Sequence, residues 1–164
     1  MKVIFVDIDG VLNNEEFLFS AVTERRQATA GSRTDFYSSM IDPSKVSILN
    51  EVVKRTGCVV VISSSWRMDH NRHELQGLLG TAGFKYSILD CTPRDVPNDE
   101  VRGDQIQAWL DAAPDRFEAI ESFVILDDED DMGDLLPALV QTTFKDGLTA
   151  SHTERLVSVL GEPS

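Results

Sequence analysis

The first twelve residues of the chain constrain its fold more than any other stretch. Residues 2–6 (Lys-Val-Ile-Phe-Val) form a continuous β-branched and aromatic run, which is typical of a strand buried on both faces of a parallel sheet. Asp7, Asp9 and Gly10 follow this run directly. Two buried carboxylates would repel each other, and a bound cation would relieve the repulsion. Because open α/β sheets bind ligands at the carboxyl ends of their strands, we expect a functional site here; an ordinary Asp-Gly turn is the alternative interpretation.

Segments with strand and helix patterns alternate along the rest of the chain. We expect further strands at residues 58–62, 86–89, 123–126 and 139–144, and helices at 43–56, 71–82, 102–113 and from 150 onward. Asp42 as an N-cap and Pro43 in the first helical position favour a helix that begins at 43. The alternation predicts an α/β fold, in which a Rossmann-like, doubly wound, mostly parallel five-stranded sheet forms a single domain of residues 1–164.

Residues 13–41 interrupt this alternation. They contain an apolar stretch from Phe17 to Phe19 and the basic pair Arg25 and Arg26. A connection of this length inside a compact domain usually has a function, often as a lid or a binding loop. We therefore expect a small flap insertion at about 13–41, too short to be a large cap domain, with Phe17 and Phe19 buried beneath it.

Three of the predicted strands end in residues that can bind ligands. The first ends at Asp7 and Asp9, the second at Ser63-Ser64-Ser65-Trp66-Arg67, and the fourth at Asp127 and Asp128. Because parallel strands end at one edge of a sheet, these side chains should meet there. Carboxylates offer the oxygen ligands that a hard cation such as Mg²⁺ prefers, and hydroxyls and guanidinium groups suit phosphate oxygens. The alternatives are a serine-rich turn with a surface arginine, and a solvated acidic loop.

The segment Asp7-Ile8-Asp9-Gly10-Val11-Leu12 resembles the first motif of the haloacid dehalogenase (HAD) superfamily of phosphatases and phosphotransferases. The resemblance implies that Asp7 attacks phosphorus to form an aspartyl-phosphate, and that Asp9 is the general acid and base. It also implies that both residues help to hold Mg²⁺, Asp9 through its main-chain carbonyl.

The middle motifs of the superfamily follow in order. Ser63 matches the Ser or Thr that binds the transferred phosphate, and we expect Ser64 and Arg67 to bind substrate beside it. Arg102, at the start of a predicted helix, matches the Lys or Arg that stabilises charge on the nucleophile and the transferred group. Arg94 is a rival for this role in the same region.

The last motif is an acidic pair that completes the Mg²⁺ site, and Asp127 and Asp128 match it. Asp130 and Asp131 follow and are candidates to support the site from further out. The resemblance therefore implies a magnesium-dependent phosphomonoesterase, with Mg²⁺ held by Asp7, Asp9, Asp127 and Asp128.

A closer likeness extends over residues 62–67, Arg102-Gly103 with Trp109-Leu110, and residues 125–128. These segments look like the small HAD domains of Swiss Army Knife RNA-repair proteins and the phosphatase domain of polynucleotide kinase–phosphatase. The likeness implies a phosphorylated substrate, and we favour a nucleic-acid 3′-phosphate end. The chain has no accompanying kinase or ligase domain, which leaves the substrate open.

Three alternatives to this function remain. The substrate is a small metabolite or nucleotide, the acceptor is a group other than water, or the chain is a catalytically silent interaction module of the same fold. The presence of both Asp7 and Asp9 argues against the silent module, because the loss of either is the simplest route to inactivity.

The net charge of −13 opposes extensive contact with a nucleic-acid backbone. We therefore expect recognition of only the last one or two nucleotides of a polynucleotide end. The residues expected to supply local positive charge or a stacking surface are Arg25, Arg26, Arg67, Arg72, Phe36 and Tyr37.

The remaining signals predict structural positions. His70, His73 and His152 lack metal-ligand spacing and are expected on the surface or in loops, and Trp66 and Trp109 in the core. The two cysteines are far apart, and no apolar run approaches the length of a membrane span. We expect a cytoplasmic protein with reduced thiols, no membrane contact and no stable protein partner evident.

Overall fold

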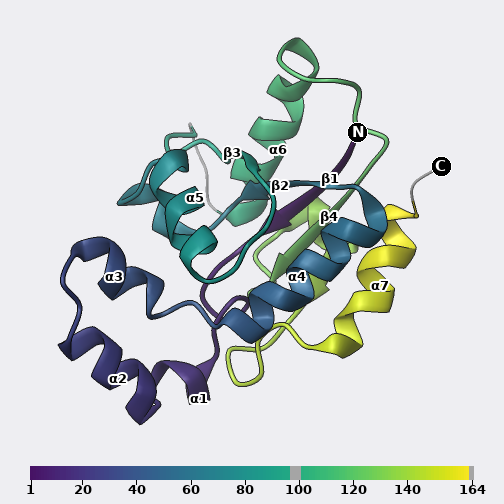
Figure 1. The fold of residues 1–164 in the computed structure, drawn as a ribbon. Coiled ribbons are helices and arrows are strands. Elements are labelled where there is room, and N and C mark those ends of the chain that lie inside the picture. Colours follow the sequence, from purple (N-terminus) through teal and green to yellow (C-terminus); the bar gives the residue numbers. More distant parts are fainter. Residues whose placement is uncertain (97–100, 163–164) are drawn as a thin grey trace.

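The computed structural model describes residues 1–96 and 101–162. Within these ranges five parallel strands form one sheet in the order β3-β2-β1-β4-β5. The strands are β1 (Lys2–Val6), β2 (Val59–Ile62), β3 (Ile88–Cys91), β4 (Ser122–Asp127) and β5 (Leu139–Gln141). The predicted five-stranded α/β sheet is confirmed, and β1 lies at its centre (Figure 1).

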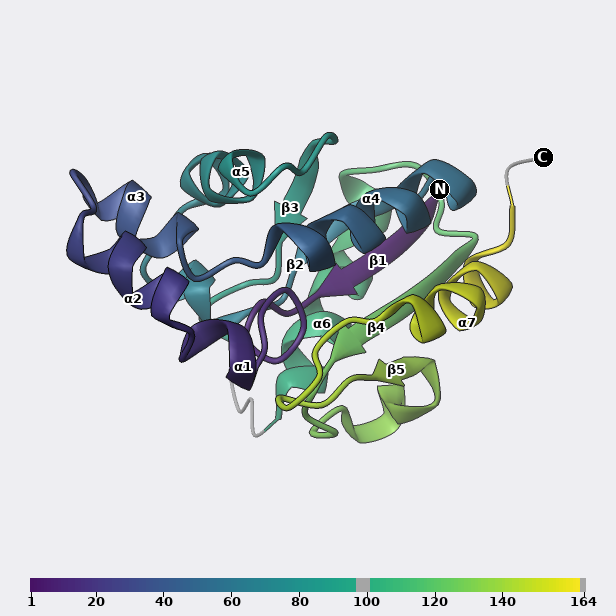
Figure 2. The same ribbon diagram turned by 60° about the horizontal axis from the view of Figure 1, so that its bottom comes forward.

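Helices cover both faces of the sheet (Figures 1 and 2). One face carries α4 (Pro43–Thr56), α5 (Arg72–Thr81) and α7 (Ala150–Leu160), and the other carries α6 (Arg102–Ala112) and the 3-10 helix η3 (Gly133–Ala138). Successive side chains of β1 point to opposite faces, so that Ile4 and Val6 join one core cluster while Val3 and Phe5 join the other. Burial on both faces explains why β1 is apolar throughout.

The ends of α4 lie where the sequence predicts them. The side chain of Asp42 accepts a hydrogen bond from the backbone N–H of Ser44, and Pro43 occupies the first turn. Gly57 ends the helix with a φ of +67°, a left-handed conformation that suits glycine. None of the helices in the described ranges is both long and apolar enough to cross a membrane.

The insertion at residues 13–41 contains three short helices, α1 (Glu15–Leu18), α2 (Ala21–Ala28) and α3 (Arg33–Ser38). Each begins after a side-chain N-cap, provided in turn by Asn14, Ser20 and Ser32. The three helices gather beyond the carboxyl ends of β1 and β2 (Figure 2). The expected burial of the two phenylalanines is wrong for Phe19, which is 79% exposed, while Phe17 is half-buried.

Two strands differ from their predicted ranges by more than one residue at an end. The strand expected at 86–89 begins at Ile88, because the side chain of Gln76 binds both the carbonyl of Tyr86 and the N–H of Ile88. The strand expected at 139–144 ends at Gln141. The next residue, Thr142, donates its hydroxyl to the carbonyl of Gly10 and so joins this segment to the turn after β1.

Candidate active site

Backbone hydrogen bonds join the strand ends that carry the predicted site. The N–H of Asp7 donates to the carbonyl of Leu126 at 3.0 Å, and the N–H of Ser63 donates to the carbonyl of Val6 at 3.0 Å. The ladder thus continues one residue beyond β1 and β2 and fixes the two residues at the same level. The chain ends of β1, β2 and β4 meet at one edge of the sheet, as parallel pairing requires.

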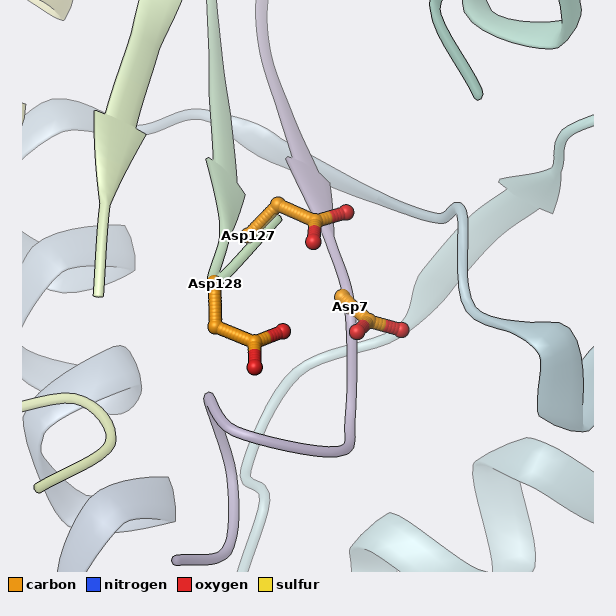
Figure 3. A group of neighbouring side chains, drawn as sticks. All are labelled: Asp7, Asp127 and Asp128. Atoms are coloured by element: carbon orange, nitrogen blue, oxygen red, sulfur yellow. The ribbon is translucent and has the colours of Figure 1, made fainter. Parts of the chain in front are cut away.

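Three carboxylates come together at this edge (Figure 3). Asp7, at the end of β1, and Asp127 and Asp128, at the end of β4, each offer one oxygen, and these oxygens lie within 4.8 Å of one another. Asp7 and Asp127 are buried, and Asp128 is half-buried. Asp131 is not part of this cluster, since its Oδ2 accepts the backbone N–H of Arg102 at 3.1 Å.

Burial and mutual repulsion make these carboxylates hard to ionise. Burial, together with the charge of Asp7, raises the pKa of Asp127 to about 7. Burial and then Asp7 raise the pKa of Asp128 to about 6. The pKa of Asp7 is also raised, chiefly by burial, although Arg102 opposes this shift.

The cluster fits a divalent cation with oxygen ligands. Oδ1 of Asp127 accepts the N–H of Glu129 at 3.0 Å, while its buried Oδ2 accepts no hydrogen bond in the described ranges and has the Nε of Arg102 3.3 Å away. One arginine does not balance three carboxylates, and an all-oxygen donor set suits Mg²⁺.

Gly10 gives Asp128 its place in the cluster. A Cβ atom on Gly10 would lie 2.3 Å from both Cγ and Oδ2 of Asp128, and the φ of Gly10 is +70°. Both the close approach and the left-handed backbone require glycine. The Asp-Gly pair after β1 is therefore part of the site's construction as well as a turn.

Arg102 is the cation beside the carboxylates. Its Nη1 lies 3.5 Å from Oδ1 of Asp7, and its Nε lies 3.3 Å from Oδ2 of Asp127. Its guanidinium also donates to the carbonyl of Ser63. The rival, Arg94, has its Nη2 3.5 Å from the carbonyl of His70. The structure thus brings Arg102, and not Arg94, to the predicted nucleophile.

Ser63 and Ser64 follow β2 and lie beside Asp7. Ser63 is fully buried, and its Oγ has no hydrogen-bond partner within the described parts of the chain. Ser64 caps the 3-10 helix η1 (Ser65–Met68) by accepting the N–H of Trp66. A hydrogen bond from the Ser64 hydroxyl also helps to lower the pKa of Asp7, against the larger effect of burial.

Arg67 is placed differently from the expected phosphate ligand. It is only 4% exposed, and its guanidinium donates to the carbonyls of Ser63, Ser64 and Thr92 and contacts Gln105. These contacts tie the turn after β2 to neighbouring segments. The sequence suggested a guanidinium aimed at substrate, whereas these donors bind backbone carbonyls of the turn after β2 and of the segment after β3.

The carboxylate of Asp9 has two donors that sequence reasoning did not connect with it. Trp66, which was expected only in the core, donates Nε1–H to Oδ2 at 2.9 Å, and Asn13 donates Nδ2–H to Oδ1 at 2.9 Å. The contact with Asn13 could have been predicted, because Asn13 follows Asp9 by four residues across the Asp-Gly turn. His70 lies in the loop after η1, within the expected surface or loop positions, but its side chain is buried. Its ring packs against Tyr37, with 4.5 Å between the ring centroids.

Comparisons with known proteins agree with this architecture. A profile of the family described as the HAD domain in Swiss Army Knife RNA repair proteins matches residues 3–153. A search of curated protein sequences finds no match. Among solved structures, the HAD domain of the effector protein Lem4 from Legionella pneumophila, an inactive mutant, is similar in fold, with a TM-score of 0.55 and 16% identity over 97% of this chain and 94% of that one. Since the family profile spans nearly the whole chain, the protein belongs to the HAD domains of the type found in Swiss Army Knife RNA repair proteins.

Proposed function

We propose that the chain is a magnesium-dependent phosphomonoesterase that acts through an aspartyl-phosphate on Asp7. The observation that carries the proposal is the group of three carboxylates around Asp7, with Arg102 within 3.5 Å of its Oδ1. Mg²⁺, when held by Asp7, Asp127, Asp128 and the main-chain carbonyl of Asp9, would offset the repulsion between a carboxylate nucleophile and a phosphate.

The side chains divide the work as follows. A carboxylate oxygen of Asp7 bonds to phosphorus while the bond to the leaving oxygen breaks, and Asp9 gives its proton to that oxygen. Asp9 then takes a proton from water as the water attacks the aspartyl-phosphate, which releases phosphate and restores Asp7. Arg102 stabilises charge on the transferred group. The unpartnered hydroxyl of Ser63 supplies a donor for a phosphate oxygen.

We further propose that the substrate is a nucleic-acid 3′-phosphate end. A pocket of about 400 Å³ adjoins Arg102 and supports a substrate larger than a lone phosphate; its other lining residues include Ser65, Arg67, Met68, Arg94, Val101, Gln105 and Asp131. The guanidinium of Arg94 makes a long contact, 3.5 Å, with a backbone carbonyl, so its charge is available to an anion. Met68 is 51% exposed and offers an apolar surface beside it. A terminal nucleotide would contact the apolar surface of Met68, and the phosphodiester next to it would contact the charge of Arg94.

The proposal changes which arginines are expected to face the substrate. Arg67 also lines this pocket, but its guanidinium already donates to the carbonyls of Ser64 and Thr92. Arg72 donates to the carbonyl of Ile88 at 3.1 Å. Arg25 lies on α2 of the insertion. Arg94 and Arg102 line the same pocket, and we assign the contact with the substrate to them.

The experiment compares kcat/KM for a short 3′-phosphorylated oligonucleotide, a 3′-mononucleotide, a panel of sugar phosphates and a generic aryl phosphate, all with Mg²⁺. Asp7→Asn should abolish turnover of every substrate, because it removes the nucleophile. Arg94→Gln should weaken turnover of the oligonucleotide about tenfold and leave the aryl phosphate unchanged, whereas Arg25→Gln, the matched control, should affect neither.

Two results would contradict parts of the proposal separately. Turnover near the wild-type level in Asp7→Asn would exclude the covalent mechanism. Efficient hydrolysis of a sugar phosphate, with a poor response to the oligonucleotide, would replace the nucleic-acid substrate with a small metabolite and leave the mechanism intact.

A further inference from the structure

Both carboxylate oxygens of Asp9 are held by donors whose roles are fixed. The indole Nε1–H of Trp66 can only donate, so Oδ2 of Asp9 must accept. The amide of Asn13 is also fixed, because its Oδ1 accepts the backbone N–H of Gly10 at 2.9 Å, which turns its NH₂ group toward Asp9. Asn13 is fully buried and Trp66 is 8% exposed. Rotation of the Asp9 carboxyl would break both bonds.

The insertion holds Trp66 in this position. Tyr37, on α3, packs edge-on against Trp66, with ring centroids 5.5 Å apart and planes at 73°. The same tyrosine packs edge-on against His70, which lies in the loop after η1. Nδ1 of His70 in turn lies 3.2 Å from the carbonyl of Trp66. The guanidinium of Arg33 covers the tyrosine ring at 5.4 Å from its centroid. Segments from the insertion and from the turn after β2 therefore enclose the indole together.

We propose that Trp66, held by Tyr37 of the insertion, is a positioning residue that orients Asp9 toward the leaving oxygen of the substrate. This inference rests on the proposed phosphomonoesterase function. The indole N–H transfers no proton itself. It keeps the carboxyl group of Asp9 in one orientation. The lone pair of Asp9 that accepts no hydrogen bond then binds the proton that passes to the oxygen of the breaking P–O bond. The insertion thus contributes to catalysis by helping to orient Asp9, in addition to covering the strand ends.

The dependence of catalysis on the leaving group separates this role from a general loss of structure. A p-nitrophenolate departs without much help from an acid, whereas an alkoxide requires protonation. General acids contribute roughly 10²–10⁴-fold where protonation is needed. Trp66→Phe keeps an aromatic ring beside Tyr37 but removes the donor. We expect kcat/KM for an alkyl phosphate to fall at least about tenfold more than kcat/KM for p-nitrophenyl phosphate.

Trp109→Phe is the matched control. Trp109 is also buried, and its Nε1 donates to a carboxylate, Oδ2 of Asp90, at 2.8 Å. It belongs to the core cluster on the face of the sheet covered by α6. The same substitution there removes the same kind of bond without touching Asp9. We expect it to leave the ratio of the two kcat/KM values unchanged.

Two further variants keep the test decisive if Trp66→Phe folds poorly. Asn13→Ala removes the donor to Asp9 without placing a new charge beside it, and should show the same selective loss on the alkyl phosphate. Tyr37→Leu should show it in weaker form. In an Asp9→Asn background, Trp66→Phe should add no further change in the ratio, because the group it orients is gone.

Equal losses on both substrates in Trp66→Phe and Asn13→Ala would overturn the positioning role and leave the phosphatase standing. A selective loss in Trp109→Phe as large as that in Trp66→Phe would also overturn it. A wild-type chain that hydrolyses neither phosphate would overturn the proposed function itself, and this inference with it.

Discussion

Replacing Asp127 with asparagine should stabilise the metal-free protein at neutral and alkaline pH, although it removes a residue of the site. The pKa of Asp127 is raised from 3.8 to about 7 by burial and by Asp7. In the folded state the carboxyl therefore binds its proton more tightly than in the unfolded chain. The protonated carboxyl group of Asp127 is tolerated in the folded metal-free protein, and the stability that depends on it is fully present below pH 3.8. This stability is lost as the pH rises through about 7.

The pKa change sets an upper limit of about 4 kcal/mol on the cost of ionising Asp127. An asparagine at this position would escape the cost, but its NH₂ group would face Nε of Arg102, which now lies 3.3 Å from Oδ2 of the aspartate. We therefore take half of the limit, about 2 kcal/mol, as the net gain. For a chain of this size the gain corresponds to a rise in Tm of about 4–8 °C.

Thermal unfolding followed by circular dichroism, with EDTA at pH 5 and pH 8, tests this reasoning. The gain should be present at pH 8 and small at pH 5, and it should be absent at both pH values in Asp130→Asn, which alters an exposed carboxylate nearby. With excess Mg²⁺ the wild type should have the higher Tm of the two, because only a chain that binds the ion is stabilised by it. A Tm for Asp127→Asn below that of the wild type in EDTA at pH 8 would refute the argument.

Further predictions concern glycines. Gly103→Ala should lower the free energy of unfolding by more than about 2 kcal/mol in urea titrations, since its Cβ would lie 2.1 Å from the backbone oxygen of Met132. Gly77→Ala, a helical position with no neighbouring atom within 4 Å, should instead raise it by about 0.5–1 kcal/mol, and equal effects would contradict the reasoning. Gly10→Ala should weaken Mg²⁺ binding measured by calorimetry, because its Cβ would displace Asp128; unchanged affinity would argue against a role for Asp128.

The parts of the structure that the sequence predicts are those that depend on local pattern. The apolar run of β1 indicates burial on both faces, and Asp42-Pro43 marks the start of α4. The convergence of Asp7 with Asp127 and Asp128 follows from parallel pairing alone, once β1 and β4 are recognised.

The parts that the sequence does not predict depend on contacts between distant segments. The burial of His70 requires Tyr37, which comes from the insertion and carries no periodic signal. The start of β3 depends on the side-chain amide of Gln76, which donates to the carbonyl of Tyr86. Strand propensities do not predict this contact. The sequence does not indicate that Arg67 donates to backbone carbonyls, because a guanidinium suits a carbonyl as well as a phosphate.

The backbone bonds between the strand ends determine how the site can open. The N–H groups of Asp7 and Ser63 donate to carbonyls of neighbouring strands, so neither residue can leave its place unless strands of the sheet separate. Amide hydrogen exchange at these two positions should therefore occur only through global unfolding, whereas the N–H groups of the short helices α1–α3 should exchange through local fraying. Asp7, the proposed nucleophile, would then be the most slowly exchanging part of the site, and the insertion would open many times within the lifetime of one folded molecule.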